Sequence, residues 1–332
     1  MPTRIQNLSM GLGKAKQADI ATASASYLKF RKLNMEVGTP QHHTETDEDE
    51  VGKGHEFITQ QFNVAKDYAA RLDKYGSAEF CTWAMAYGLG NVSEVAGLYT
   101  LTPIDATSTL ELPYFSVVDQ VTEGGGSALD YLYYGCAIDS LNFAFNYGPG
   151  RQSTRMTCDY VGSGKYLTPS AVSLPAVQTE SYMLSQSMAL TINGVNYVSA
   201  KTILSGNFGW SNALNRNAGY FPGSGTQDNA AIRGRLEIGK RVPTFQFTAR
   251  LLSSSSEYSK LIAGTTGTAV LTVTFDATHT MTITLQKMSF RAVENGETDG
   301  ILSVTVTGAP QYDSVNGVVT VTSKCGVTGI AQ

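Results

Sequence analysis

The sequence predicts a mainly β protein in which two tandem β folds, each with a short flanking α-helix, follow an extended N-terminal arm. Apolar and polar residues alternate along many short segments, as they do in strands with one buried face. Aromatic residues are plentiful, with 17 Tyr and 13 Phe, and only 16% of the residues are charged, which suits pleated sheets. The 332 residues, 42% of them hydrophobic, are enough for one large domain or two ordinary ones.

The N-terminal segments contain the arm and the first strands. Residues 1–26 are small, polar and without periodicity, so we expect an extended arm. Residues 27–35 predict the first strand. After an acidic loop, residues 57–66 and 68–73 predict two more strands.

Residues 76–90 predict a short helix. Gly76 stands three residues before Glu79, which is the spacing of an N-terminal cap, and Gly88 and Gly90 end the segment. Because apolar residues lie on nearly all sides of this helix, we expect it to be buried.

The clearest β-hairpin lies at residues 138–162, after strands expected at 95–101 and 112–118. Its first strand places aromatic and aliphatic side chains on one face and polar or small ones on the other, and the second strand alternates in the same way. A Gly-Pro-Gly sequence turns the chain between them. Strict alternation of this kind predicts a half-buried pair of strands.

The second half of the chain repeats this order. A hairpin at 189–198 turns on Asn193-Gly194, a strong type I′ signal. The capping-box spacing of Ser254 and Glu257 predicts a short helix at 253–264. Further strands are expected around it, with a long polar loop at 212–234 and a turn at Asn316-Gly317, at residues 201–205, 235–240, 244–252, 269–275, 280–285, 301–307 and 318–323.

Both halves therefore have the same order of predicted elements: a strand, a long polar loop, two strands, a capped helix and several more strands. We interpret this as a duplicated fold with the arm at 1–26, a first domain at 27–175 and a second at 176–332. The alternative is a single large sandwich in which helices happen to recur.

Charge and cysteine usage exclude several classes of protein. The net charge of −4 disfavours a dedicated nucleic-acid binder, which is normally basic. No secretory leader and no membrane-spanning apolar run is found in the sequence. The four cysteines are widely spaced without a CxxC pair, which predicts reduced thiols and synthesis in a cytoplasm.

The segment QHHTETDEDEVGKGHEF at 41–57 holds three of the four histidines and most of the acidic residues of its region. An EF-hand is excluded because Val51 and Ile58 occupy ligand positions. A zinc site would need His43, Glu45 and His55 to converge, whereas histidines in an acidic loop usually face solvent. With no convergent catalytic motif, we expect no enzymatic activity, no cofactor and no metal.

The two tryptophans, Trp83 and Trp210, are candidate carbohydrate platforms. Trp83 lies in the helix predicted to be buried, so a core position is expected. Trp210 opens a loop, where an interface is the favoured role because aromatic residues commonly anchor protein contacts.

Three stretches together resemble the major tail tube proteins of long-tailed (siphovirus-like) bacteriophages, a family of roughly 300 residues. They are a polar arm leading into the first strand at 13–34, an acidic-then-glycine segment at 47–57 and a cysteine-containing hairpin ending in Gly-Ser-Gly at 135–164. The resemblance implies a β-sandwich or barrel with a flanking helix, assembled into stacked rings around a channel for the genome. Two folds per chain imply a trimeric, pseudo-hexameric ring, and one fold implies a hexamer.

The same resemblance implies the partners and the location. The chain would contact itself, the tape measure, tail terminator and distal tail proteins, and transiently double-stranded DNA, but no membrane. It would be assembled in the host cytoplasm and reside in the virion tail. An acidic channel lining would let DNA slide, whereas a basic one would retain it.

The resemblance also suggests a role for the acidic loop, since the long loop after the first strand contacts the adjacent ring in such proteins. Residues 37–56 and 212–234 stand at this position in the two halves. We expect the first loop to stack on a basic partner such as the arm, whose residues 1–35 carry net +5. The residues of this hypothesis are Glu45, Asp47, Glu48, Asp49, Glu50 and His55 in the loop, and Arg4, Lys14 and Lys16 in the arm.

Two other functions remain open from the sequence. One is a different virion β-protein, a capsid decoration or a carbohydrate-binding tail component, which would use Trp210 or the tyrosines of 130–135. The other is a metal-dependent hydrolase that uses His43 and His55. Ring formation, glycan binding and bound metal distinguish the three functions.

Overall fold

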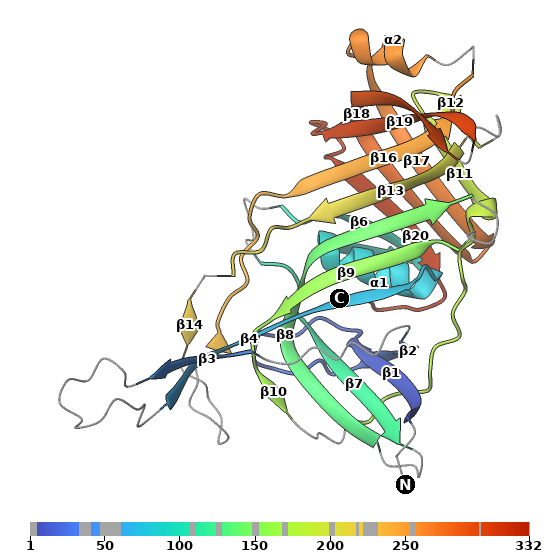
Figure 1. Cartoon of the computed structure of the whole chain (residues 1–332). Helices are drawn as coiled ribbons and strands as arrows, with labels where there is room; N and C mark the ends of the chain where they lie inside the picture. Colours follow the sequence, from blue (N-terminus) through green and yellow to red (C-terminus); the bar gives the residue numbers. More distant parts are fainter. Residues whose placement is uncertain are drawn as a thin grey trace.

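The computed structural model describes residues 5–32, 41–46, 61–105, 111–123, 128–147, 153–167, 172–198, 203–216, 219–221, 232–252, 256–298 and 300–331. Within these ranges the chain is mainly β, as predicted: one 18-stranded antiparallel sheet, a separate two-stranded hairpin and two short α-helices (Figure 1). The first-half strands are β1 (Ile5–Gly13), β2 (Tyr27–Arg31), β3 (Gln41–Thr46), β4 (Gln61–Tyr75), β5 (Gly90–Val95), β6 (Leu98–Pro103), β7 (Phe115–Glu123), β8 (Ala128–Asn146), β9 (Arg155–Gly162) and β10 (Tyr166–Leu167).

The second half contains the remaining strands, and α1 (Ala78–Leu89) and α2 (Glu257–Ile262) follow β4 and β16 in sequence. Its strands are β11 (Met188–Ile192), β12 (Val195–Asn196), β13 (Ile203–Ser211), β14 (Tyr220–Phe221), β15 (Ile232–Arg233), β16 (Val242–Arg250), β17 (Thr266–Asp276), β18 (His279–Thr298), β19 (Ile301–Gln311) and β20 (Val319–Cys325).

A ladder of seven strands runs through the middle of the molecule in the order β4–β9–β8–β13–β16–β19–β18. Two side sheets branch from it. The N-terminal part of β8 pairs with β7 and β10, and β7 continues to β1 and β2. The N-terminal part of β18 pairs with β17 and β20, which continue to β11–β12 and to β6–β5. The two longest strands, β8 and β18, therefore each belong to the ladder and to a side sheet.

Helix α1 is the most deeply buried element. Ser77 caps its N-terminus by accepting a hydrogen bond from the Phe80 amide, so the cap lies one residue after the predicted Gly76. Gly90 ends the helix in the left-handed conformation, as the sequence predicted. All twelve residues of α1 are buried, which confirms the expectation of a core helix.

Helix α2 differs sharply from α1. Only Glu257 is buried, and it accepts a hydrogen bond from the Tyr197 hydroxyl. Tyr258 and Ile262 are 65% and 72% exposed. The predicted capping residue Ser254 lies outside the described residues, and Ser256 precedes the helix without a side-chain cap. In Figure 1, α2 stands at the end of the molecule, beyond β18 and β19.

A single large core extends through both halves of the chain and includes both tryptophans. Trp83 donates its indole N–H to the Gly13 carbonyl at 2.9 Å and packs against Phe115, as expected for a core residue. The expectation of an interface role for Trp210 is wrong. It is 3% exposed in β13 and donates to the Asn212 side chain at 2.9 Å, because the strand continues through the residues taken as a loop.

Several local predictions are confirmed. Strands β8 and β9 form the antiparallel hairpin predicted at 138–162. Strands β11 and β12 turn on Asn193-Gly194, whose φ values of 49° and 80° fit a type I′ turn. Gly317 has a φ of 75° in the turn before β20.

Other local predictions are wrong for physical reasons. Residues 5–13 are not part of a patternless arm, because β1 pairs with β2 and β7 and buries Met10 and Leu12. The strands expected at 57–66 and 68–73 are, in their described part, the one strand β4. Residues 235–240 form no strand: the Leu236 amide donates to the Tyr114 hydroxyl and the Gly239 amide to the Asn212 carbonyl.

The described residues contain no helix that is long and apolar enough to span a membrane. All four cysteines are buried free thiols. Burial is the main cause that raises the pKa of each thiol, so these groups remain protonated and unreactive at neutral pH.

Because α1 is buried and α2 is mostly exposed, a substitution in α1 should lower the free energy of unfolding much more than one in α2. Trp83→Ala should reduce the free energy of unfolding by about 3–5 kcal/mol, because it leaves a cavity and an unpaired Gly13 carbonyl. Tyr258→Ala should change it by less than about 0.5 kcal/mol, since Tyr258 is mostly exposed. Urea denaturation of the unassembled protein measures both, and equal losses would contradict the assignment of α1 as the core helix.

Candidate assembly surfaces

The β3–β4 hairpin extends from one end of the ladder, beyond the rest of the sheet (Figure 1). In it, β3 pairs with residues 61–67 of β4, from Thr46 opposite Gln61 to Gln41 opposite Asp67. The remainder of β4, Tyr68–Tyr75, continues into the ladder beside β9. The acidic segment 41–57 therefore begins at Gln41, at the point where β4 passes from the ladder into the hairpin.

Asp67 organises the base of the hairpin. One carboxylate oxygen lies 2.8 Å from Nε2 of His43 on β3, and the other accepts a 2.7 Å hydrogen bond from Arg233 on β15. The Arg233 side chain is only 5% exposed, so this pair is shielded from water on one side. Its backbone is fixed as well, because the Arg233 amide donates to the Ser163 carbonyl.

The same contact joins the two segments predicted to be stacking loops. Arg233 belongs to β15, which pairs with β14 and lies at the end of the 212–234 segment. Asp67 and His43 belong to the hairpin from which the 37–56 segment extends. The structure thus brings the bases of both segments together, a relation that no pattern in the sequence indicated.

Most residues of the stacking-loop hypothesis lie outside the described residues, namely Asp47, Glu48, Asp49, Glu50 and His55, together with Arg4 of the arm. Glu45 lies in β3. Within the described part of the chain, no group of three His, Cys, Asp or Glu side chains is placed to hold a metal ion. The one described histidine of the proposed metal set, His43, contacts Asp67.

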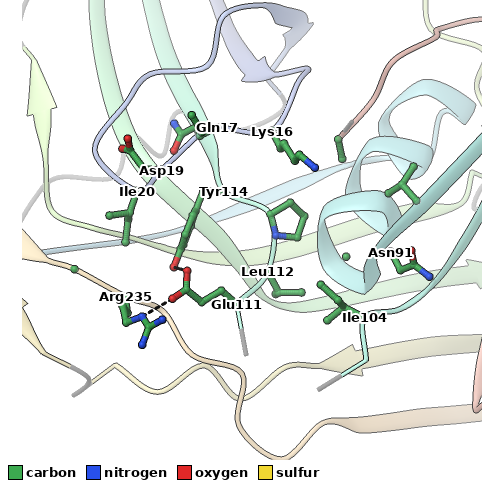
Figure 2. Close-up of a pocket in the computed structure, with 16 residues that line it drawn as sticks. Lys16, Gln17, Asp19, Ile20, Asn91, Ile104, Glu111, Leu112, Tyr114 and Arg235 are labelled. Carbon is green, nitrogen blue, oxygen red and sulfur yellow. Dashed lines mark hydrogen bonds and ion pairs between the residues drawn. The ribbon is translucent and has the colours of Figure 1, made fainter. Parts of the chain in front are cut away.

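Lys14 and Lys16 follow β1 and do not lie in a detached arm. The Lys14 carbonyl accepts hydrogen bonds from the Tyr87 hydroxyl and the Ala331 amide, so this segment is fixed against α1 and the C-terminal segment. Lys16 lies at the edge of a hollow of about 880 Å³ that is also lined by Asp19, Tyr114 and Arg235 (Figure 2).

The hollow contains an internally paired polar group. The Glu111 carboxylate accepts from Arg235 at 2.6 Å and from the Tyr114 hydroxyl at 3.1 Å (Figure 2). Burial raises the pKa of Tyr114, so its phenol stays protonated at neutral pH. Glu111, Arg235 and Tyr114 therefore bind one another at the wall of the hollow.

A second surface lies beyond 280–285, the only part of β18 that the sequence predicts as a strand. Strand β18 continues to Thr298, and in its last part, Ala292–Thr298, it pairs with β19 on one side. No other described strand pairs with this part, since the β17 ladder ends at Ser289 and the β20 ladder at Leu285. Residues 294–297 are exposed. The run of polar residues after Arg291 concealed the strand.

The junction between the two halves shows how such an edge is covered. Strand β13 pairs with β8 from Ser211 opposite Ser140 to Ser205 opposite Asn146, and Phe208 lies opposite Phe143. Beyond the ladder, Asp139 accepts hydrogen bonds from the Leu214 amide and from Arg216 at 2.7–2.8 Å. Strand β13 therefore covers the edge of β8 that β9 leaves open.

Comparison with family models gives a match to the phage tail tube protein family over residues 13–312. Comparison with curated proteins gives no match. The match includes both helices and the seven-strand ladder, whereas β20 and nearly all of β1 lie outside it, and it confirms the resemblance drawn from the three sequence stretches. The chain therefore belongs to the phage tail tube protein family, whose members are structural components of the virion tail.

Proposed function

We propose that this chain is the protomer of a tail tube, in which copies join edge to edge into rings and the rings stack around a channel for the genome. The observation that carries the proposal, beside the family, is the uncovered edge of β18 at Ala292–Thr298, which among the described strands has a partner on one side only. An open edge offers backbone donors and acceptors that another strand can satisfy.

The number of copies in a ring depends on the tandem organisation of the chain. We propose the division into 27–175 and 176–332, so that three chains form a pseudo-hexameric ring; six chains would be needed if each chain counts as one unit. Recurring strand pairings in the two halves support the division: β4–β9–β8 in the first and β16–β19–β18 in the second.

The remaining parts of the proposal concern the ends and the interior of the tube. Tape measure, tail terminator and distal tail proteins would contact the end rings, and assembly would take place in the host cytoplasm. The net charge of −4 is compatible with a lining along which double-stranded DNA slides. A carbohydrate-binding role has less support, because Trp210 is buried.

Stacking of rings is assigned to the two loops whose bases meet at Asp67 and Arg233. The Arg233–Asp67 hydrogen bond supports this assignment, because it holds the described ends of both segments side by side. The acidic residues Asp47, Glu48, Asp49 and Glu50 would steer a basic surface of that ring into register.

Self-assembly is tested by imaging the purified protein by negative-stain electron microscopy at low and high concentration. We expect stacked rings with a central channel whose number rises with concentration, and averaged images should distinguish three chains per ring from six. A monomer at all concentrations, also when added to preformed tail-tip complexes, would contradict the proposed function.

The charge of the acidic loop is tested by replacing Asp47, Glu48, Asp49 and Glu50 with the corresponding amides. The variant should form tubes more slowly, and its rate should depend less on salt, because screening no longer removes an attraction. Light scattering at several salt concentrations measures both effects. A variant with the wild-type rate and the wild-type salt dependence would contradict the proposed electrostatic role of the acidic loop.

The common base of the loops is tested by Arg233→Met. The free energy of unfolding should fall by about 1.5–3 kcal/mol, because Asp67 loses a charged hydrogen-bond donor in a shielded place, and tube formation should slow. Arg155→Met is the matched control: Arg155 pairs with Asp73 at 3.0 Å but is 50% exposed, so its loss should cost less than about 1 kcal/mol. Equal effects on assembly would show that the base has no special role.

A further inference from the structure

We propose that helix α2 is a lid that opens and closes over a cluster of buried aromatic side chains while the rest of the chain stays folded. The side-chain hydrogen bond that holds the closed position runs from the Tyr197 hydroxyl to the Glu257 carboxylate, at 2.8 Å. The inference goes beyond the proposed function and does not depend on it, because the lid belongs to the single chain.

The aromatic cluster consists of Tyr197, Phe247 and Phe290. The rings of Tyr197 and Phe247 lie edge to face with centroids 4.9 Å apart, and those of Phe247 and Phe290 are 6.4 Å apart. Leu261 of α2 packs against the same core, and Tyr197 is only 3% exposed. Burial raises the pKa of Tyr197, so its hydroxyl keeps the proton that it donates to Glu257. Lifting α2 would therefore expose the cluster at Tyr197.

Helix α2 has little stability of its own. It is six residues long, whereas isolated helices shorter than about 12 residues are marginal in water. Ser256 precedes α2 without a side-chain hydrogen bond to the helix, whereas Ser77 caps α1. The helix therefore depends on its contacts with the body of the protein to keep its position.

The contacts of α2 with the body of the protein bury little of the helix. Glu257 is its one buried residue, and the large side chains of Tyr258 and Ile262 are 65% and 72% exposed. In α1, by contrast, all twelve residues are buried. Because the stabilisation from apolar contacts grows with the apolar area removed from water, α2 is held much less firmly than α1.

Two charged side chains of α2 provide an independent observation. Glu257 is 6% exposed, and its second carboxylate oxygen, Oε2, has no hydrogen-bond partner among the described residues. The buried ammonium nitrogen of Lys260 has no partner within the same part of the chain. Burying a charged group without a protein partner costs free energy, and opening returns both groups to water. The closed position is thus opposed by the charges that it buries.

Gly264 supplies a hinge at the C-terminal end of α2. Its φ is 60°, which favours glycine, and a side chain at this position would meet no described atom within 4 Å. Strand β17 begins two residues later and is fixed on both sides, by β11 and by β18. A rotation about Gly264 therefore lifts the helix without disturbing the sheet.

Opening is tested by hydrogen exchange of the backbone amides in the unassembled full-length protein, at several urea concentrations below the unfolding transition. After correction for intrinsic rates, the amides of α2 should exchange at least about a hundredfold faster than those of α1, with almost no dependence on urea, because local opening exposes little surface. Exchange of both helices at one rate, with one urea dependence, would mean that α2 opens only when the whole chain unfolds and would overturn the inference.

The hydrogen bond that holds the lid is tested by Tyr197→Phe, with Tyr258→Phe as the matched control. Tyr197→Phe should make the α2 amides exchange about tenfold faster and leave those of α1 unchanged, because buried Glu257 loses its donor. Tyr258→Phe removes the same hydroxyl from an exposed side chain and should change neither helix. Equal exchange in the two variants would show that this bond does not hold the helix, and the inference would fail.

A variant with the opposite expected effect tests the buried charge. Lys260→Met keeps an unbranched side chain of similar length but removes the unpaired ammonium group, so the α2 amides should exchange about threefold slower or more. Lys324→Met, at an exposed position of β20, is the control and should leave α2 unchanged. Unchanged or faster exchange in Lys260→Met would contradict the role of the unpaired charges in opening. These measurements use the unassembled chain, so their failure leaves the proposed function untouched.

Discussion

Backbone hydrogen bonding along β8 is the interaction on which the rest of the structure depends. Nearly every part of this strand has neighbours that satisfy it: β7 and β10 along its first part, β9 and β13 along its second. A buried strand cannot leave its amides and carbonyls unpaired without a large penalty, so the position of β8 determines where four other strands lie. The bulge at Asp139 lets one strand serve two sheets, and α1 packs against it.

A buried ion pair fixes the segment that connects the two halves across this framework. Lys74 on β4 donates to Glu180 at 3.1 Å and to the Arg31 carbonyl, and both side chains of the pair are about 4% exposed. Burial lowers the pKa of Lys74 although Glu180 opposes the shift, so the charged lysine is less stable here than in water. The pair therefore adds little net stability and mainly holds the connecting segment at one position beside the start of α1.

Features that depend on a few neighbouring residues could be predicted from the sequence. The turn at Asn193-Gly194, the alternation of β8 and β9 and the apolar surface of α1 are local signals, and each was read correctly. Strand β1 was missed because Gly11 and Gly13 lower its strand propensity. They are needed because a side chain at Gly11 would meet Leu174 and one at Gly13 would meet Ser24. Such close approaches are tertiary and leave no local pattern.

In the candidate surfaces, too, only features that depend on neighbouring residues could be predicted from the sequence. The acidic composition of 41–57 indicates a distinct surface at this hairpin, but the Asp67–Arg233 contact joins distant parts of the chain and cannot be predicted from spacing. The edge of β18 was concealed because exposed edge residues are polar and break the alternation that identifies a strand. Polar edges are what a free chain requires, since an apolar open edge would promote aggregation.

The covered edge of β8 and the open edge of β18 carry different side chains, although the β8–β9 and β18–β19 ladders each shift by one residue. The junction within the chain is permanent, so it can be apolar: Leu141 and Phe143 of β8 face Trp210 and Phe208 of β13. At the equivalent positions β18 carries Val293 and Asn295, with Glu294 and Glu297 beside them. A covalent connection keeps the first junction at high effective concentration, so its apolar side chains are never exposed to other chains. The open edge of β18 instead carries charged residues, which keep an unpaired strand edge from aggregating.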